Sequence, residues 1–454
     1  ICACLVGSEM CIRDRCMNPC YDPNDPPRND AETLTELMRL TAISDVYEPG
    51  STFKILTAAS ALDSGVTTPQ DSFYCSAKIT VDGDTIRCWG RPHGAETMAD
   101  GLKNSCNPVF VELALRMGTD TFYRYLTAFG LGKKTGIDLP GESPGILITS
   151  RNVKRVDLAR IGFGQSVALT PIQMMMAANS VINGGKLMKP YIVSEIQTPD
   201  GETLERFHPT VMAAPIRPET SDTMRLLLER VVSEGGGKNA AIAGYRIGGK
   251  TGTAQVYKNG RVVRDTHIGS FYGFAPVNDP QVSILVIVKE ADVPIDYGGT
   301  TAAPFARQIM QEMLPYLGIE PENDEKDEEI EVPALKGLTI GDAKRKLSQV
   351  GLESVTDGAN TVVLDQLPPA GAKLVKGGHV MLYTAGSEEL TPEELVCVPD
   401  LTGLGDVDCA RLVRQRGLTM SMTGQGLCTE QSPAAGEYVQ PGTTIFLLMA
   451  GDDE

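Results

Sequence analysis

The sequence has no run of 18 or more apolar residues, so it contains no segment long enough to cross a bilayer as an apolar helix. Basic residues are scarce: 41 Lys and Arg stand against 58 Asp and Glu, and the net charge of −17 argues against nucleic acid as a partner. No Cys-x-x-Cys pair occurs among the eleven cysteines, and the four histidines are scattered, so we expect no zinc site and no other metal or cofactor. What remains is an acidic chain of 454 residues, 42% of them hydrophobic, which suffices for one large domain and smaller ones.

Residues 1–16 lack the basic start and the small-residue cleavage site of a secretory signal peptide, although they begin with an apolar, cysteine-rich stretch. They also match nothing that follows, and we interpret them as a non-native leader outside the fold. Farther on, Cys75 and Cys88 flank the turn at 81–84, which predicts a hairpin. Whether these two thiols form a disulfide stays open, because it depends on the redox compartment.

An acidic stretch over 319–331 divides the chain into a long mixed region and a twofold repeat. Pro333 and Gly337 recur as Pro399 and Gly403, an offset of 66 residues. Two copies are too few for a solenoid, so we expect separate small modules. The predicted divisions are a leader over 1–16, a large domain over 17–318, linkers over 319–331 and 388–396, and repeats over 332–387 and 397–454.

Apolar periodicity predicts helices over 171–183, 223–235 and 303–317, and three consecutive strands within 245–290. The last of these strands is apolar on both faces, which is typical of a buried strand. This order favours the α+β class, with an antiparallel sheet flanked by helices and a helical subdomain. Each repeat has the pattern of one helix followed by strands, a small α+β module without an evident catalytic group.

The stretch EPGSTFKILTAASALDSG, residues 48–65, places Ser51 and Lys54 three positions apart at the start of a small apolar helix. Residues at i and i+3 lie on one helix face, so the hydroxyl and the amine are expected side by side. A bland alternative is that Ser51 caps the helix and Lys54 is a solvated charge. The pair alone does not decide between them, because such a spacing arises by chance.

Two further motifs follow in the chain. Ser105 and Asn107 flank a cysteine ahead of a predicted helix, where Asn107 could equally be a helix cap. Lys250 begins a Lys-Thr-Gly-Thr run in the first predicted strand, preceded by two glycines that leave room for another backbone. A second Lys-Thr-Gly at 134–136 lies among Gly and Pro, and we expect it to be a surface turn. Ser-x-x-Lys, Ser-x-Asn and Lys-Thr-Gly together are the motif set of serine acylases of the β-lactamase and penicillin-binding type.

These residue types suit acyl transfer. Ser51 would be the nucleophile and a neutral Lys54 its base, which requires burial and a second cation, Lys250, to lower the pKa of Lys54. Ser105 can pass the proton from Lys54 to the leaving amine, and Asn107 can hold both Lys54 and the substrate amide.

The strand carrying the third motif would bind the substrate. Lys250, Thr251, Gly252 and Thr253 are expected to receive an extended peptide and its carboxylate along the strand edge. The backbone N–H groups of Ser51 and Thr253 are the expected oxyanion hole.

The chain resembles a class B penicillin-binding protein over about residues 17–317. The resemblance rests on YDPNDPPRN (21–29), ISDVYEPGSTFK (43–54), TGIDLPGE (135–142), IGFGQSVALTPIQ (161–173), GKTGTAQ (249–255) and GGTTAAPFA (298–306). The two repeats resemble PASTA modules, and with them the chain is most similar to the cell-division or stage V sporulation branch. The resemblance implies the penicillin-binding/β-lactamase-like transpeptidase fold.

It also implies the activity of a peptidoglycan D,D-transpeptidase that cross-links stem peptides, releases D-Ala and is acylated by β-lactams. The implied partners are stem peptides or a lipid-linked precursor, a glycosyltransferase, and divisome or cortex proteins, at the extracytoplasmic face of the membrane. Two alternatives stay open. One is a D,D-carboxypeptidase or β-lactam hydrolase, with Glu142 as the base for deacylation, and the other is a non-catalytic β-lactam-sensing or wall-binding protein.

Members of this family also carry a membrane anchor, a pedestal domain and a pair of strands ahead of the segment matching MNPCYDPN (17–24). We find none of these in the sequence and expect an N-terminally truncated chain. The buried strand at 281–290 is then expected to lack a neighbour on one side and to expose an apolar edge.

Overall fold

The computed structural model divides the chain into two units, Ile1–Glu329 and Ile330–Glu454. It describes residues 2–5, 12–15, 28, 30–90, 92–258, 261–289, 291, 297–322, 329–356, 362–384, 396–424, 426–435, 438–439 and 443–450. Most of the YDPNDPPRN segment, the centre of the predicted linker at 319–331 and nearly all of that at 388–396 lie outside the described residues. None of the helices in these ranges combines the length and the apolar composition that a membrane span requires.

The first unit is built on a five-stranded antiparallel sheet of order β13-β14-β15-β1-β2. β13 (Gly248–Lys258), β14 (Arg261–Ala275) and β15 (Val282–Lys289) are the three predicted strands, and β13 forms one edge. β14 is central because it pairs with both others, Lys250 lying opposite Tyr272 and Tyr272 opposite Leu285.

β15 was expected to lack a neighbour on one side, and this expectation is wrong, because a further strand pairs with it there. β1 (Cys2–Leu5) pairs with β15, Cys2 lying opposite Leu285, and β2 (Ile12–Arg15) pairs with β1. Parts of the segment interpreted as a leader outside the fold thus complete the sheet. The physical reason is that a buried strand such as β15 presents unpaired N–H and C=O groups, and a neighbouring extended segment satisfies them.

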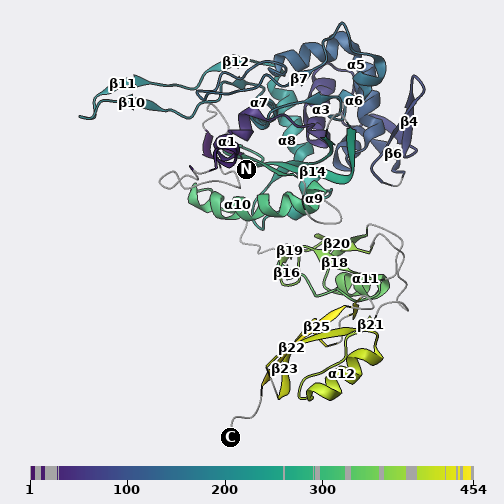
Figure 1. Cartoon of the computed structure of the whole chain (residues 1–454). Helices are drawn as coiled ribbons and strands as arrows, with labels where there is room; N and C mark the ends of the chain where they lie inside the picture. The colour runs from purple at the N-terminus through teal and green to yellow at the C-terminus, as the bar shows by residue number, and fades with distance from the viewer. Residues whose placement is uncertain are drawn as a thin grey trace. The chain divides into compact units, whose positions relative to one another are not determined.

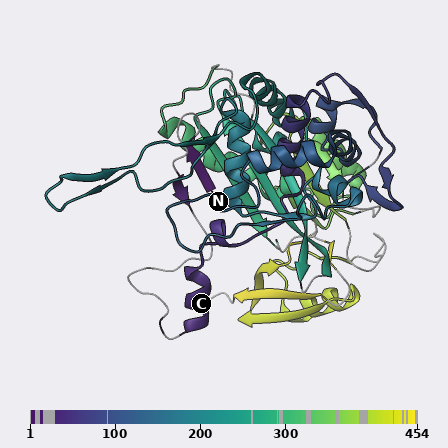
Figure 2. The same cartoon turned by 90° about the horizontal axis from the view of Figure 1, so that it is seen from above.

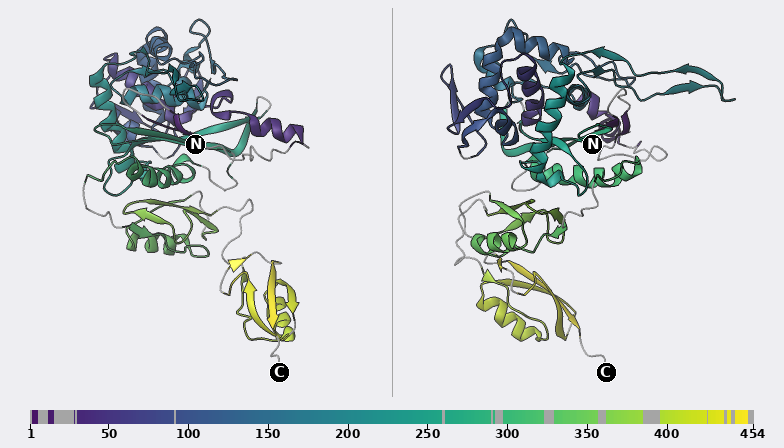
Figure 3. Two further views of the ribbon diagram at one scale, coloured as in Figure 1. Left: turned by 90° about the vertical axis from the view of Figure 1, so that its left-hand side faces the viewer. Right: turned by 180° about the vertical axis from the view of Figure 1, so that it is seen from behind.

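Helices cover both faces of the sheet (Figures 1 and 3). Alternation along β14 sorts the side chains: Phe271 belongs to a core with α10 (Ala303–Tyr316), whereas Tyr272 belongs to the larger core on the opposite face. That larger core contains α3 (Lys54–Asp63), α5 (Asn107–Ala128), α7 (Pro171–Ile182) and α8 (Pro218–Ser233). The predicted helices at 171–183, 223–235 and 303–317 are confirmed.

Short elements connect these parts. They are α1 (Ala31–Met38), α2 (Thr41–Ser44), η1 (Gly50–Phe53), β3 (Ser72–Cys75), β4 (Lys78–Val81), β5 (Asp84–Arg87), β6 (Gly94–Thr97), α4 (Met98–Lys103), β7 (Ile146–Leu147), α6 (Arg155–Ile161), β8 (Val167–Ala168), β9 (Leu187–Met188), β10 (Glu195–Gln197), β11 (Thr203–Arg206), β12 (Val211–Ala213), η2 (Lys238–Ala240) and α9 (Gly298–Thr301). The predicted hairpin at 81–84 is β4–β5. The β10–β11 hairpin projects away from the rest of the unit (Figure 2).

The second unit contains the two repeats, which have the same topology. The first has β16 (Glu329–Glu331), α11 (Ile340–Gln349), β17 (Glu353–Thr356), β18 (Asp365–Leu367), β19 (Lys373–Val375) and β20 (His379–Tyr383). The second has β21 (Val396–Cys397), α12 (Asp406–Gln415), β22 (Thr419–Gly424), β23 (Leu427–Ser432), β24 (Tyr438–Val439) and β25 (Thr444–Ala450). The sheets β17-β20-β18 and β22-β25-β23 correspond, and each module has its own apolar core.

Candidate active site

Ser51 and Lys54 lie where a 3₁₀ turn continues into a helix. Ser51 belongs to η1, and Lys54 is the first residue of α3. In a 3₁₀ turn the side chains at i and i+3 eclipse each other, so both side chains point the same way. The residue preceding α3 is Phe53, and no side chain caps the helix, so the alternative that Ser51 is a helix cap is wrong.

The Lys54 amine is buried, not solvated. Its side chain is inaccessible, and Nζ donates to the Ser105 backbone carbonyl at 2.6 Å and to Asn107 Oδ1 at 2.7 Å. Nζ also lies 3.2 Å from Ser105 Oγ. The first two motifs of the sequence therefore meet at one amine.

The backbone conformation at Ser105 directs the Ser105 carbonyl and the Asn107 side chain towards Lys54. Ser105 has φ +56, a left-handed conformation that an L residue adopts at a cost, and Cys106 precedes the first residue of α5. Asn107 is that first helical residue rather than a cap, and its Nδ2 donates to the Arg87 carbonyl at 2.9 Å. The amide is thus held from both ends, with its oxygen directed at Lys54.

Lys250 reaches the same hydroxyl from β13. Its side chain is fully buried, and Nζ hydrogen-bonds Ser105 Oγ at 3.0 Å and the Thr251 carbonyl at 3.0 Å. Ser105 Oγ therefore lies between two amines, those of Lys54 and Lys250. The three motifs converge on a single hydroxyl.

Burial sets the protonation of both amines. Desolvation lowers the pKa of Lys54 from its usual 10.5 to about 7, although the thiols of Cys88 and Cys106 act in the opposite direction. Desolvation, and secondarily the charge of Lys54, lowers the pKa of Lys250 well below its usual value. A substantial fraction of Lys54 is therefore uncharged near neutral pH, which is the condition for a lysine to act as a base.

Glycines bring the backbone of the Ser51 turn against the third motif. Gly50 has φ +53, and a Cβ there would lie 2.7 Å from the Thr253 carbonyl oxygen. A Cβ on Gly252 would lie 2.9 Å from the Pro49 carbonyl oxygen, and Gly298 donates its N–H to Thr253 Oγ1 at 3.2 Å. The strand edge and the serine turn are consequently in backbone contact.

Comparison with known proteins settles the family. The family model of the penicillin binding protein transpeptidase domain matches residues 17–311, and the PASTA domain model matches residues 330–386 and 396–451. The chain belongs to the penicillin-binding protein transpeptidase family.

Individual relatives agree with this assignment. Stage V sporulation protein D of Bacillus subtilis (strain 168) is 40% identical over 382 residues, covering 82% of this chain and 58% of the relative. Penicillin-binding protein PbpB of Mycolicibacterium smegmatis is 32% identical over 301 residues, covering 64% and 46% of the two chains. The chain thus spans about half the length of these curated relatives.

Solved structures show the same fold. Penicillin binding protein 3 of Mycobacterium tuberculosis, in complex with ampicillin, superposes with a TM-score of 0.63 at 25% identity and covers 72% of this chain and 73% of that one. Penicillin Binding Protein 2X of Streptococcus thermophilus has a TM-score of 0.62 at 20% identity and covers 99% of this chain and 67% of that one. The transpeptidase fold followed by PASTA modules is therefore confirmed for this penicillin-binding protein.

The second Lys-Thr-Gly forms none of the hydrogen bonds described for these two amines. It lies in a loop, as predicted, but Thr135 is buried rather than on the surface. Glu142 explains the difference, because Oε1 accepts from the Thr135 N–H at 2.6 Å and its hydroxyl at 2.5 Å, and Oε2 accepts from the Gly136 N–H at 3.1 Å. The carboxylate of Glu142 is therefore engaged in holding a loop.

Sequence reasoning missed two backbone groups that support the candidate site. One is the Arg87 carbonyl, which has no sequence signal because any residue supplies a carbonyl. The other is Gly164, whose carbonyl accepts from the Gly50 N–H at 3.0 Å and whose φ is +86. The second could have been found, since the IGFGQS segment was quoted for the family resemblance and glycine is the residue that tolerates this conformation.

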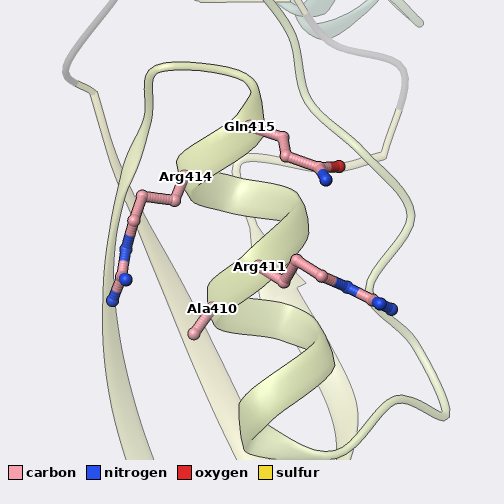
Figure 4. A pocket seen from close by; sticks show the side chains of 4 residues that line it. All are labelled: Ala410, Arg411, Arg414 and Gln415. Atoms are coloured by element: carbon pink, nitrogen blue, oxygen red, sulfur yellow. The ribbon is translucent and has the colours of Figure 1, made fainter.

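A shallow pocket on α12 lies outside the transpeptidase unit. It is lined by Ala410, Arg411, Arg414 and Gln415 (Figure 4). The side chains of Arg411 and Arg414 extend to different sides of the helix, and Arg411 is paired with Asp408 at 2.6 Å. These cations do not converge, so the pocket carries no recognisable binding chemistry.

Proposed function

We propose that this chain is a serine D,D-transpeptidase that cross-links the stem peptides of peptidoglycan. The observation that carries the proposal is the buried amine of Lys54, which contacts Ser105 and Asn107 and has a pKa of about 7. Relatives such as the peptidoglycan D,D-transpeptidase FtsI homolog of Mesostigma viride, 30% identical over 335 residues, support it.

Acylation begins at Ser51. The neutral Lys54 amine removes the proton of Ser51 Oγ, which attacks the carbonyl carbon of the penultimate D-Ala. The backbone N–H groups of Ser51 and Thr253 stabilise the oxyanion, each contributing about 3–4 kcal/mol. The contacts of Gly50 and Gly252 with the opposite backbone support this pairing of turn and strand.

The proton then leaves through Ser105. Its hydroxyl lies between Lys54 and Lys250, so it can hand a proton to the leaving nitrogen while it takes one from Lys54. The C–N bond breaks and D-Ala departs as a neutral amine. An acceptor amine of a second stem peptide then attacks the ester, and Ser51 regains its proton as the cross-link forms.

The substrate peptide would lie along β13. This strand is at the edge of the sheet among the described strands, and the side chains of Thr251 and Thr253 are partly exposed. Their hydroxyls would bind the carboxylate of the stem peptide. Lys250 lies in the same strand, and its amine is directed at Ser105.

The relatives also suggest an inhibitor class and partner proteins. We propose that β-lactams acylate Ser51, since penicillin binding protein 3 of Mycobacterium tuberculosis was solved with ampicillin. A lipid-linked precursor, a glycosyltransferase and division or cortex proteins are the proposed partners, at the extracytoplasmic face of the membrane.

The test is acylation followed by acceptor transfer. The full chain is incubated with a fluorescent penicillin and the modified residue is identified by mass spectrometry; we expect Ser51, and no labelling of Ser51→Ala. A stem peptide is then supplied with and without an acceptor amine. Cross-linked product supports the transpeptidase, free acid alone would indicate a hydrolase, and a permanent adduct without product would indicate a sensor.

A further inference from the structure

Three cysteines and a histidine meet beside the Ser-x-Asn motif. The thiol sulfurs of Cys75, Cys88 and Cys106 and a ring nitrogen of His93 all lie within 4.8 Å of one another. Cys75 and Cys106 are completely buried, and all three cysteines are free thiols. The expectation of no zinc site rested on sequence spacing, which did not reveal this cluster.

The residues come from four separate places in the fold. Cys75 ends β3, Cys88 follows β5, His93 precedes β6, and Cys106 directly precedes α5. The Cys75 end of β3 pairs with Gly94, next to His93, and the Cys88 N–H donates to the Ala77 carbonyl at 2.7 Å. Rigid strand pairing thus fixes the relative positions of the backbones that carry these side chains.

The distances suit a tetrahedral metal ion. Zinc bonds of about 2.3 Å to sulfur and about 2.0–2.1 Å to nitrogen place the ligand atoms of a tetrahedron about 3.5–3.8 Å apart. Cys88 Sγ and His93 Nδ1 are 3.8 Å apart, and the widest separation in the group is below 4.8 Å. Closure around one ion requires movements of about 1 Å or less, within the reach of side-chain rotation.

The local charge also favours a cation. Glu96 is buried, and its Oε1 forms no hydrogen bond with any of the described residues, although it lies 3.8 Å from His93 Nδ1. A buried carboxylate oxygen in this state is costly unless positive charge stands nearby.

We propose that Cys75, Cys88, His93 and Cys106 bind one Zn²⁺ ion as a closed, tetrahedral Cys₃His site. Binding displaces the protons of those thiols that are not already ionised, because a metal ion binds the thiolate and the neutral imidazole. Four protein ligands leave no open position, so the ion is structural.

The consequence concerns the catalytic loop. Cys106 stands between Ser105 and Asn107, the two residues that hydrogen-bond Lys54. A metal ion that ties Cys106 to β3 and to the end of β5 would hold this loop in its left-handed turn. Cys106 and its metal ion therefore act as positioning groups for the site, whatever reaction that site performs.

The test begins with metal content. The full chain, purified under reducing conditions, is loaded with Zn²⁺ or Co²⁺ and desalted, and bound metal is measured by mass spectrometry. We expect one tightly bound ion per chain that is missing from His93→Ala, and cobalt spectra with thiolate charge-transfer bands and tetrahedral d–d bands. The control is His208→Ala, which removes an imidazole remote in sequence and should leave the stoichiometry unchanged.

Three results would overturn the proposal. The first is a loaded wild-type chain that retains no ion, and the second is a His93→Ala variant that retains as much as the wild type. The third is a Cys88–Cys106 disulfide that forms in the zinc-loaded protein after the reductant is removed, because the two thiols would then serve as a redox pair instead. His93→Ala removes a half-buried side chain and spares the buried thiols, and its circular dichroism confirms folding. Metal content is independent of Ser51 acylation, so the proposed function and this site can fail separately.

Discussion

Lys54 and Lys250 share one hydrogen-bonding partner, the Ser105 hydroxyl, which lies 3.2 Å from one amine and 3.0 Å from the other. A hydroxyl has one proton to donate and two lone pairs to accept with. When Lys54 and Lys250 both donate to Ser105 Oγ, the hydroxyl proton is free to point at the leaving nitrogen of the substrate. This direction of donation is the one that a relay between Lys54 and a leaving amine requires.

The rate of Ser51 acylation should increase as the pH rises through about 7. The pKa of Lys54 is lowered by burial from 10.5 to about 7, so the amine is largely protonated below that pH and a competent base above it. The measurement is the second-order rate of labelling by a fluorescent penicillin across a pH series in which circular dichroism stays constant. A profile that is flat through neutrality, or that rises only near 10.5, would contradict the assignment of Lys54 as the base.

Asn107→Asp should move that profile to higher pH. The new carboxylate would stand where Oδ1 now lies 2.7 Å from the Lys54 amine, and an adjacent negative charge stabilises the ammonium form. The first pKa unit of increase lowers the neutral fraction at pH 7 about fivefold, and each further unit lowers it about tenfold.

The matched variant is Asn107→Ala, which removes the contact without adding charge. It should lower the rate at every pH and leave the midpoint nearly in place. If both variants gave the same midpoint, Asn107 would have no electrostatic influence on Lys54.

Gly164→Ala should disable acylation although it alters no group that reacts. Gly164 has φ +86, and an added Cβ would lie 2.0 Å from the Gly50 carbonyl oxygen and 2.7 Å from Phe53 Cβ. The turn that carries Ser51 must then shift, and a displacement of about 1 Å costs about a hundredfold in rate. We expect that loss together with a lower melting temperature.

Gly201→Ala is the control for backbone conformation. Gly201 also has φ +86, but a Cβ there meets nothing within 4 Å. Its cost should be limited to about 1–2 kcal/mol of conformational strain in the β10–β11 turn, with normal labelling. Equal losses of acylation in both variants would show that the contact with Gly50 is irrelevant.

Sequence reasoning succeeded where the signal was local or repeated. The spacing of Ser51 and Lys54 and the apolar periodicity of the predicted helices are short-range patterns, and the two modules repeat one sequence pattern. The repeat also explains why the two modules share a hydrogen bond: Gln366 accepts from the Leu335 N–H at 2.7 Å, and Gln431 accepts from the Leu401 N–H at 2.8 Å. Such features depend on neighbours within a single element or module.

It failed where distant segments meet. Cys75 and Cys106 are 31 positions apart and belong to no common motif, so only the packing of β3 against α5 brings their sulfurs together. The pairing of β1 with β15 joins residues 2–5 to residues 282–285, which lie far apart in the sequence, and it has no local signal. The contact of Asn107 with the Arg87 carbonyl could not be predicted, because every residue has a backbone carbonyl and the sequence does not mark this one.

Glu142→Gln should destabilise the protein without changing the lifetime of the acyl-enzyme. The carboxylate accepts three hydrogen bonds, from the Thr135 N–H and hydroxyl and from the Gly136 N–H, and an amide must turn an N–H towards one of these donors. The lost acceptor costs about 1–3 kcal/mol, measurable by chemical denaturation. Glu202→Gln, at an exposed position, should leave stability unchanged. Labelled protein should release the penicilloyl group at the wild-type rate, because Glu142 is occupied with its loop; a slower release would instead make it the deacylation base and favour a hydrolase.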